Sequence, residues 1–302
     1  MNVSREIAAA AELDRSGFLP LPGESFSGFI NRFKLSEESF AAFEQELAEH
    51  GSARMFEEFE VTPAERIAPE IMKEAAGKTM ALYKFENRRV PGFFLSGKVG
   101  ALWGGCMIGD PDNGFAVMLL RSEFRNRAKW YVYERQELIA HELCHAMRQS
   151  LNDSRLEEYF AYQTSGSFLR RHLGNCFVRE LDAILFIFPT LILLGATLTR
   201  ELSRLYFPLW PFWIFAAIYP LFLLLRNFSG VRAVKKAEKN LKKFGITEVS
   251  PVLFRCTFDE LKILGKLRNR EEFEEYRLRM QEKELRWAIM GIRFFDQKGN
   301  TP

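Results

Sequence analysis

Two long runs without a charged residue constrain this 302-residue chain more than any other feature. One extends from residue 183 to 199 and the other from 207 to 225. A helix needs roughly 17–25 mainly apolar residues to cross the hydrocarbon core of a bilayer. The segment between the runs, RELSRLY, is too short to form a domain. The sequence therefore predicts a transmembrane helical hairpin over residues 181–228, with a tight outer turn.

Two alternatives to a spanning hairpin follow from the same residues. A very apolar helical hairpin buried in a soluble protein has a similar composition. The four prolines of this region also permit a re-entrant hairpin that does not cross fully; they are Pro189, Pro208, Pro211 and Pro220. Tyr206, Trp210 and Trp213 cluster at the start of the second run. Amphipathic aromatic residues favour the headgroup layer, so this cluster favours the membrane interpretation.

The flanking charges predict the orientation of the hairpin. Arg170, Arg171 and Arg179 precede it, and seven cations follow it between residues 226 and 243. The only charged residues of the turn are Arg200, Glu201 and Arg204. The positive-inside bias places both soluble parts in the cytoplasm, so we expect a multi-pass membrane protein. The seven cations also make anionic membrane lipid an expected partner.

Charge and cysteine content exclude few other classes. Residues 226–302 hold 18 Lys and Arg against 11 Asp and Glu. Their signs alternate along helical stretches such as REEFEEYRLRMQEKELR, which is typical of a solvated helix face, so no nucleic acid is expected as a partner. The four cysteines are far apart and indicate reduced thiols in the cytosol. The N-terminus lacks the basic and apolar regions of a cleavable signal peptide.

The patterning along the chain predicts an α+β fold in four parts. Residues 1–78 have helical periodicity. Short apolar runs separated by turns predict strands between 79 and 124, and helices are expected at 131–151 and 154–173. These segments form a predicted domain over 79–180, followed by the hairpin at 181–228. A basic helical region, 229–302, contains a capping box formed by Thr257 and Glu260.

The stretch HELCH brings His141, Glu142 and His145 together in a chain that has only four histidines. Residues four apart share one face of a helix, so His141 and His145 can bind one metal ion from the same side. Glu142 then lies beside that ion and is suited to act as a general base. The alternative is a helix with two partly buried histidines that bond to their neighbours.

A catalytic zinc site needs a third protein ligand, and a second helix is predicted 13 residues past His145, in LEEYFAYQ. A His-Glu-x-x-His motif followed by a helix with a Glu resembles the gluzincin metallopeptidases. Glu158-Tyr-Phe-Ala161 in particular resembles the ligand helix of the anthrax lethal-factor-like metallopeptidases. The resemblance implies a zincin-like catalytic domain with a small mixed sheet, in which Glu158 completes a Zn²⁺ site. Glu157, about 100° away around the helix, is the reserve choice.

The resemblance covers roughly residues 115–167. It implies that Phe115–Leu120 is the edge strand that pairs with an extended peptide or protein substrate. Many gluzincins have an acid four residues after the ligand Glu, to orient the first His. Tyr162 stands there, and its hydroxyl can either take that role or pack in the core. The sequence does not assign the residue that stabilises the transition state; the nearby candidates are Tyr131, Tyr133, Tyr159 and His172.

Two other membrane metallopeptidase families fit less well. Site-2-type proteases carry the motif inside a span, and the segment around His141 is too polar for lipid. A second family places spans between the motif and a Glu-x-Glu-Ala-Asp ligand helix, for which 271–275 is the nearest candidate. The sequence thus predicts a membrane-anchored zinc metallopeptidase. The rival is a membrane-anchored interaction protein that binds metal without hydrolysis, which would have no chemical need for Glu142.

Overall fold

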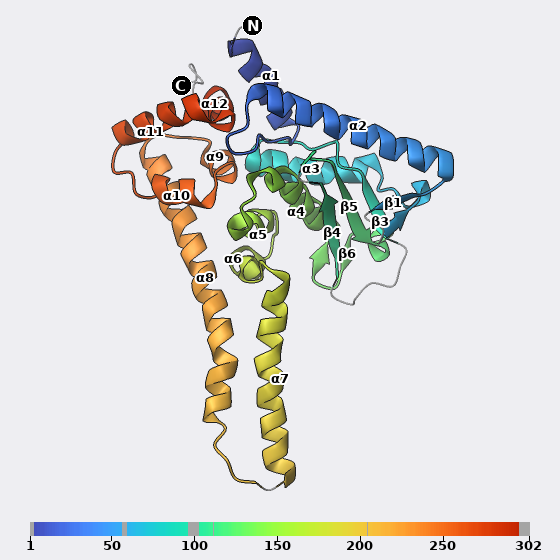
Figure 1. Cartoon of the computed structure of the whole chain (residues 1–302), viewed down its shortest axis with the longest axis vertical. Helices are drawn as coiled ribbons and strands as arrows, with labels where there is room; N and C mark the ends of the chain where they lie inside the picture. Colours follow the sequence, from blue (N-terminus) through green and yellow to red (C-terminus); the bar gives the residue numbers. More distant parts are fainter. Residues whose placement is uncertain (1–2, 56–58, 96–102, 111, 204, 296–302) are drawn as a thin grey trace.

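The computed structural model describes residues 3–55, 59–95, 103–110, 112–203 and 205–295. In these residues the chain is mostly helical and has three small sheets. Figure 1 shows a soluble part from which two long helices, α7 and α8, extend side by side. The elements before them are α1 (Val3–Arg15), α2 (Phe26–His50), β1 (Ala53–Met55), β2 (Phe59–Val61), α3 (Pro69–Tyr83), β3 (Gly92–Leu95), β4 (Gly105–Gly109), β5 (Ala116–Arg121), β6 (Lys129–Trp130), β7 (Tyr133–Glu134), α4 (Arg135–Arg148), α5 (Ser154–Tyr162) and α6 (Phe168–Leu173). The later elements are α7 (Glu180–Ser203), α8 (Trp210–Lys243), α9 (Val249–Phe254), α10 (Phe258–Leu264), α11 (Arg270–Lys283) and α12 (Leu285–Met290).

The two apolar runs form helices that are long and apolar enough to cross a membrane. The candidate spans are Leu181–Ser203 and Trp210–Lys243, and only 17% of the most apolar window of each is buried. The core helix of a soluble protein would bury most of such a window. Helix α8 continues past the apolar run, and its buried residues Val234, Ala237 and Leu241 join the core of the soluble part. The lysines of α8, at positions 235–243, therefore lie on the part of the helix beyond the apolar run.

The main sheet has the strand order β3-β5-β4. Strand β5 is parallel to β3 and antiparallel to β4, and all six of its residues are buried. The prediction that Phe115–Leu120 forms the edge strand is therefore wrong, because β5 is central and β4 lies at the edge. A continuous apolar run without alternation is typical of a strand that is buried on both faces.

The strand predicted at residues 79–86 is also wrong. Helix α3 begins at Pro69 and extends to Tyr83, and Lys84 ends it in the left-handed conformation at φ 58°. Its buried residues Ala75, Ala76, Thr79 and Tyr83 follow helical spacing. The Thr79 hydroxyl donates to the Ala76 carbonyl at 2.9 Å, a bond made within the helix. The β-branched and aromatic residues of this stretch thus pack a helix face.

Two helical predictions hold only in part. Residues 1–78 include the antiparallel pair of β1 and β2 as well as α1 and α2. The single helix expected over 154–173 is divided into α5 and α6. Between them Glu137 of α4 accepts hydrogen bonds from Ser165 Oγ at 2.8 Å and from the Gly166 backbone N–H at 2.6 Å. This buried carboxylate stabilises the non-helical turn.

One hydrophobic cluster joins the segments before and after the hairpin. Tyr83 of α3 stacks on Phe254 of α9 with ring centroids 4.0 Å apart, and Phe160 of α5 meets Phe254 edge-on. The predicted capping box of Thr257 and Glu260 is confirmed at the start of α10. Figure 1 shows α9 to α12 at the end of α8 that is remote from the turn of the hairpin. The C-terminal helices thus complete the core around α4 and α5.

Candidate metal centre

Helix α4 presents both motif histidines on one face. His141 and His145 are one turn apart, and their Nε2 atoms are separated by 3.1 Å. The apolar side of the same helix is fully buried, with Ile139, Leu143 and Met147 in the core. The polar face of α4 is therefore held toward the solvent side by the packing of its apolar face.

Helix α5 brings the third group to the same point. Glu158 Oε2 lies 3.5 Å from His141 Nε2, and Glu158 Oε1 lies 3.4 Å from His145 Nε2. Ala161, one turn later, is fully buried, and its small side chain lets α5 approach α4. Glu157 lines the same cleft, but Glu158 is the residue whose carboxylate lies against both rings. The structure thus brings together His141, His145 and Glu158, as the sequence predicted.

These three side chains form a group that could hold a metal ion. One donor atom from each lies within 4.8 Å of the others. Donors on a tetrahedral zinc, with bonds of about 2.0–2.1 Å, are about 3.4 Å apart. The distances of 3.1, 3.4 and 3.5 Å between these donors agree with that spacing. Two imidazoles and one carboxylate are also a ligand set that leaves a fourth position open.

The protonation of the two histidines differs because they share one small space. Burial, and then the charge of His145, lower the pKa of His141 to about 3. Burial also acts to lower the pKa of His145, but its hydrogen bond to Glu158 and the charges of Glu142 and Glu158 outweigh burial and raise the pKa to about 9. The pair therefore holds one proton, on the ring that Glu158 stabilises.

Glu142 lies beside the ligand group in a more enclosed position. The residue is 5% exposed. Burial raises its pKa to about 7, with the charge of Glu158 acting in the same direction. The charge of His145 and a hydrogen bond from the Met107 backbone oppose that rise. A carboxyl group with a pKa near neutrality can both accept and return a proton.

The group opens into a cleft of about 580 Å³ between α4, α5 and strand β4. Gly104, Gly105 and Gly109 line it from the strand side. A Cβ atom at Gly105 would lie 2.8 Å from the Leu119 carbonyl oxygen, so a side chain is excluded there. Among the described residues β4 pairs only with β5, so its other edge has no neighbouring strand, and the Met107 backbone of β4 donates a hydrogen bond to Glu142. The sequence predicted a strand in this stretch but placed the edge strand at Phe115–Leu120 instead, although the glycines between apolar residues here were a signal of close backbone approach.

Of the aromatic and histidine candidates for the remaining roles, the cleft includes Tyr133 and Tyr162. The Tyr162 ring meets His141 edge-on, with ring centroids 4.5 Å apart. The backbone of Ala161 also forms a hydrogen bond with the His141 ring and so helps to orient it. Tyr131 and His172 are exposed elsewhere, and Tyr159 lies outside the residues that line the cleft.

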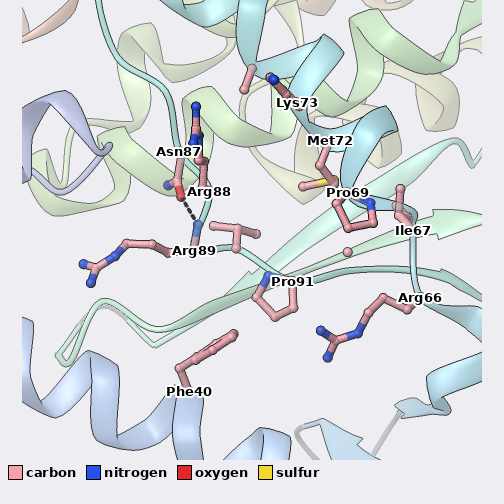
Figure 2. A pocket seen from close by; sticks show the side chains of 13 residues that line it. Phe40, Arg66, Ile67, Pro69, Met72, Lys73, Asn87, Arg88, Arg89 and Pro91 are labelled. Carbon is pink, nitrogen blue, oxygen red and sulfur yellow. Dashed lines mark hydrogen bonds between the residues drawn. The ribbon is translucent and has the colours of Figure 1, made fainter.

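A second pocket, of about 290 Å³, lies between α2, α3 and the segment that leads into β3. Its floor is apolar, and Figure 2 shows Met72, Ile67, Pro69 and Pro91 around it. Its cations are largely engaged: Arg66 pairs with Glu44 at 2.5 Å, and Arg89 pairs with Glu37 at 2.6 Å. The residues that line this pocket include no His, Cys, Asp or Glu. The metal group in the first cleft is therefore the candidate functional site.

No family model, no curated protein and no solved structure matches this chain.

Proposed function

We propose that this chain is a membrane-anchored zinc metallopeptidase of the gluzincin type. One observation carries the proposal: a three-donor group with zinc-like spacing stands beside a buried carboxyl group in an open cleft. A structural metal site has four protein ligands and needs neither the open side nor Glu142. Hydrolysis needs both an open position on the metal and a carboxylate such as Glu142.

The proposed chemistry follows from the positions of these side chains. His141, His145 and Glu158 would hold zinc, which would supply a Lewis acid that polarises the scissile carbonyl group and activates water. Glu142 takes a proton from the attacking water and delivers it to the leaving amine as the C–N bond breaks. Its raised pKa suits both transfers. The backbone of Ala161 and the Tyr162 ring hold His141 in place.

The arrangement of the sheet supports a zincin-like fold and an extended peptide or protein substrate. Strand β4 is antiparallel to β5 and lies at the edge beside the helix that carries the histidines. An extended peptide can add to such an edge through main-chain hydrogen bonds. Glycines at 104, 105 and 109 leave gaps in the strand surface beside Trp103 and Met107, which also line the cleft.

The hairpin is proposed to anchor this site on the cytoplasmic side of a membrane. Asp182, near the start of α7, accepts hydrogen bonds from Tyr219 at 2.7 Å and from Arg226 at 2.5 Å, both on α8. These two hydrogen bonds join α7 and α8 at the end of the hairpin next to the soluble part. The cations before and after the hairpin support this orientation, because the turn carries fewer.

Metal content tests the ligand set. Purified wild-type protein should hold about one zinc per chain. Glu158→Ala should lose most of the metal, because among the described residues only the Glu158 carboxylate lies within 3.5 Å of both imidazoles. Glu157→Ala is the matched control and should keep it. Equal zinc content in the two variants, measured by plasma mass spectrometry, would remove Glu158 from the site.

Substitution of Glu142 tests the reaction. Glu142→Gln should keep the zinc and the fold, and should lower the rate of peptide cleavage by about 10²–10⁴-fold, because an amide cannot accept the proton. Cleavage products of a peptide library are measured by mass spectrometry for both proteins. Cleavage by the variant at the wild-type rate contradicts the assigned base. A zinc-loaded wild type that cleaves nothing supports the rival interaction protein.

A further inference from the structure

The hairpin of β6 and β7 ends in two exposed apolar residues. Tyr131 and Val132 form its two-residue loop and are 84% and 71% exposed. Tyr131 has φ 48°, a left-handed conformation that Asn or Gly adopts more readily in such turns. Trp130 is held below the loop by the Arg121 guanidinium, 3.4 Å from its ring centroid. A firmly held turn thus presents a Tyr-Val pair to the surroundings, at a cost in backbone strain.

Helix α6 carries a second group of exposed apolar side chains. Phe168 and Leu169 are each 65% exposed, and Leu173 is 46% exposed. The helix is nevertheless fixed in position, since Asn227 of α8 donates to the His172 carbonyl at 2.7 Å. These exposures cannot be explained by a mobile end of the chain.

The loop and α6 form one continuous surface. Arg170 of α6 donates to the Val132 carbonyl, and its guanidinium lies 4.7 Å from the Tyr133 ring centroid. Phe177, after α6, is 46% exposed and meets Phe186 of α7 edge-on at 5.6 Å. We name this surface the apolar patch; it consists of Tyr131, Val132, Phe168, Leu169, Leu173 and Phe177. The patch therefore runs directly into the first candidate span.

Position and charge indicate what covers the apolar patch. Figure 1 shows α6 and β6 on the side of the soluble part from which α7 and α8 extend. Exposed Arg125 and Arg127 precede the β6–β7 hairpin in the chain, and exposed Arg179 follows Phe177 of the patch by two residues. Apolar and aromatic side chains with a basic border are typical of a surface that enters the headgroup layer of an anionic membrane.

We propose that the apolar patch inserts into the headgroup layer of the membrane that the hairpin crosses. This inference rests on the proposed membrane anchoring. The hairpin alone would let the soluble part tilt, and the patch adds a contact to one side that prevents tilting. Tyr133 belongs both to the β6–β7 hairpin and to the wall of the metal cleft, so the cleft lies close to the bilayer surface. The substrates are then extended segments of membrane proteins next to their own spans.

Depth measurements on the full-length protein test the patch without reference to cleavage. Single spin labels at Val132→Cys and Leu169→Cys are compared with Glu38→Cys on the exposed face of α2. The background is Cys106→Ser, because Cys106 is the native cysteine that is not buried. The protein is placed in vesicles of phosphatidylcholine and phosphatidylserine. Collision rates with oxygen and with a polar nickel complex should place labels 132 and 169 at the headgroup–acyl boundary and label 38 in water. The proposal would be overturned if the nickel complex reached labels 132 and 169 as readily as it reaches label 38.

A cleavage experiment tests the substrate class separately. A peptide that the wild type cleaves is offered free in solution and fused to a single transmembrane segment in the same vesicles. The double variant Tyr131→Ser/Val132→Ser should cleave the fused peptide at least tenfold more slowly and the free peptide at the wild-type rate. Equal loss on both substrates would overturn the positioning role. Absence of cleavage by the wild type counts against the peptidase and leaves the depth result standing.

Discussion

At the residue scale, the proton held by the two histidines would govern how the proposed site takes up metal. His145 has a pKa of about 9, because its bond to Glu158 and the nearby carboxylate charges outweigh burial, so it is charged at pH 7 before metal binds. A metal ligand must be a neutral imidazole. Zinc binding at pH 7 should therefore release about one proton.

Calorimetry in buffers of different ionisation enthalpy measures that release. Because the folded-state pKa lies above neutrality, the apparent zinc affinity should rise about tenfold per pH unit between 7 and 9, and then level off. Glu157→Ala is the control and should release the same number of protons. A binding enthalpy that does not vary with the buffer would mean that both imidazoles are neutral beforehand.

At the scale of elements, the short turn after α6 packs against α5 at Gly174. A Cβ atom at Gly174 would lie 2.1 Å from the Tyr162 ring, which in turn packs edge-on against His141. Gly174→Ala must push this ring toward the metal group. We expect a loss of about 1–3 kcal/mol in the free energy of unfolding, as for other overpacked sites, and weaker zinc binding.

Gly77→Ala in α3 is the matched control for this substitution. A Cβ atom at Gly77 meets nothing within 4 Å. Alanine inside a helix should stabilise the protein by about 0.5–1 kcal/mol and leave zinc affinity unchanged. Thermal unfolding and competition with a chelator measure both quantities. A Gly174→Ala protein with wild-type values for both would show that the ring moves aside without disturbing His141.

At the scale of the whole molecule, the topology of the hairpin decides where the site can act. In the proposed orientation the turn lies outside, and both soluble segments lie in the cytoplasm. Single cysteines at positions 203, 38 and 282 are all placed at exposed residues. In intact cells, with Cys106 replaced by Ser, a membrane-impermeant thiol reagent should label position 203 and spare 38 and 282. Labelling of 38 or 282 would invert the topology.

Local patterns were sufficient for the parts of this protein that depend on neighbours in the chain. The hairpin follows from composition over 183–199 and 207–225, and the histidine pair follows from the period of a helix. The capping box at Thr257 depends on residues within one turn. At 79–86 strand-forming residues predicted a strand, although residues up to Tyr83 belong to a helix and Tyr83 packs in one cluster with Cys144 and Met147 of α4. Tertiary packing overrides propensity in such segments.

The sequence by itself determined the ligand types, their spacing and the two apolar helices, because each depends on residues a few positions apart. Only the tertiary structure decided that β5 is central and β4 is the edge beside the metal group, since strand order depends on pairing between distant segments. It also decided that Glu158 rather than Glu157 meets both histidines, because the rotation of α5 is set by burial of Leu156, Phe160 and Ala161. The apolar patch has the same origin, because Val132 and Arg170 come together only through the fold.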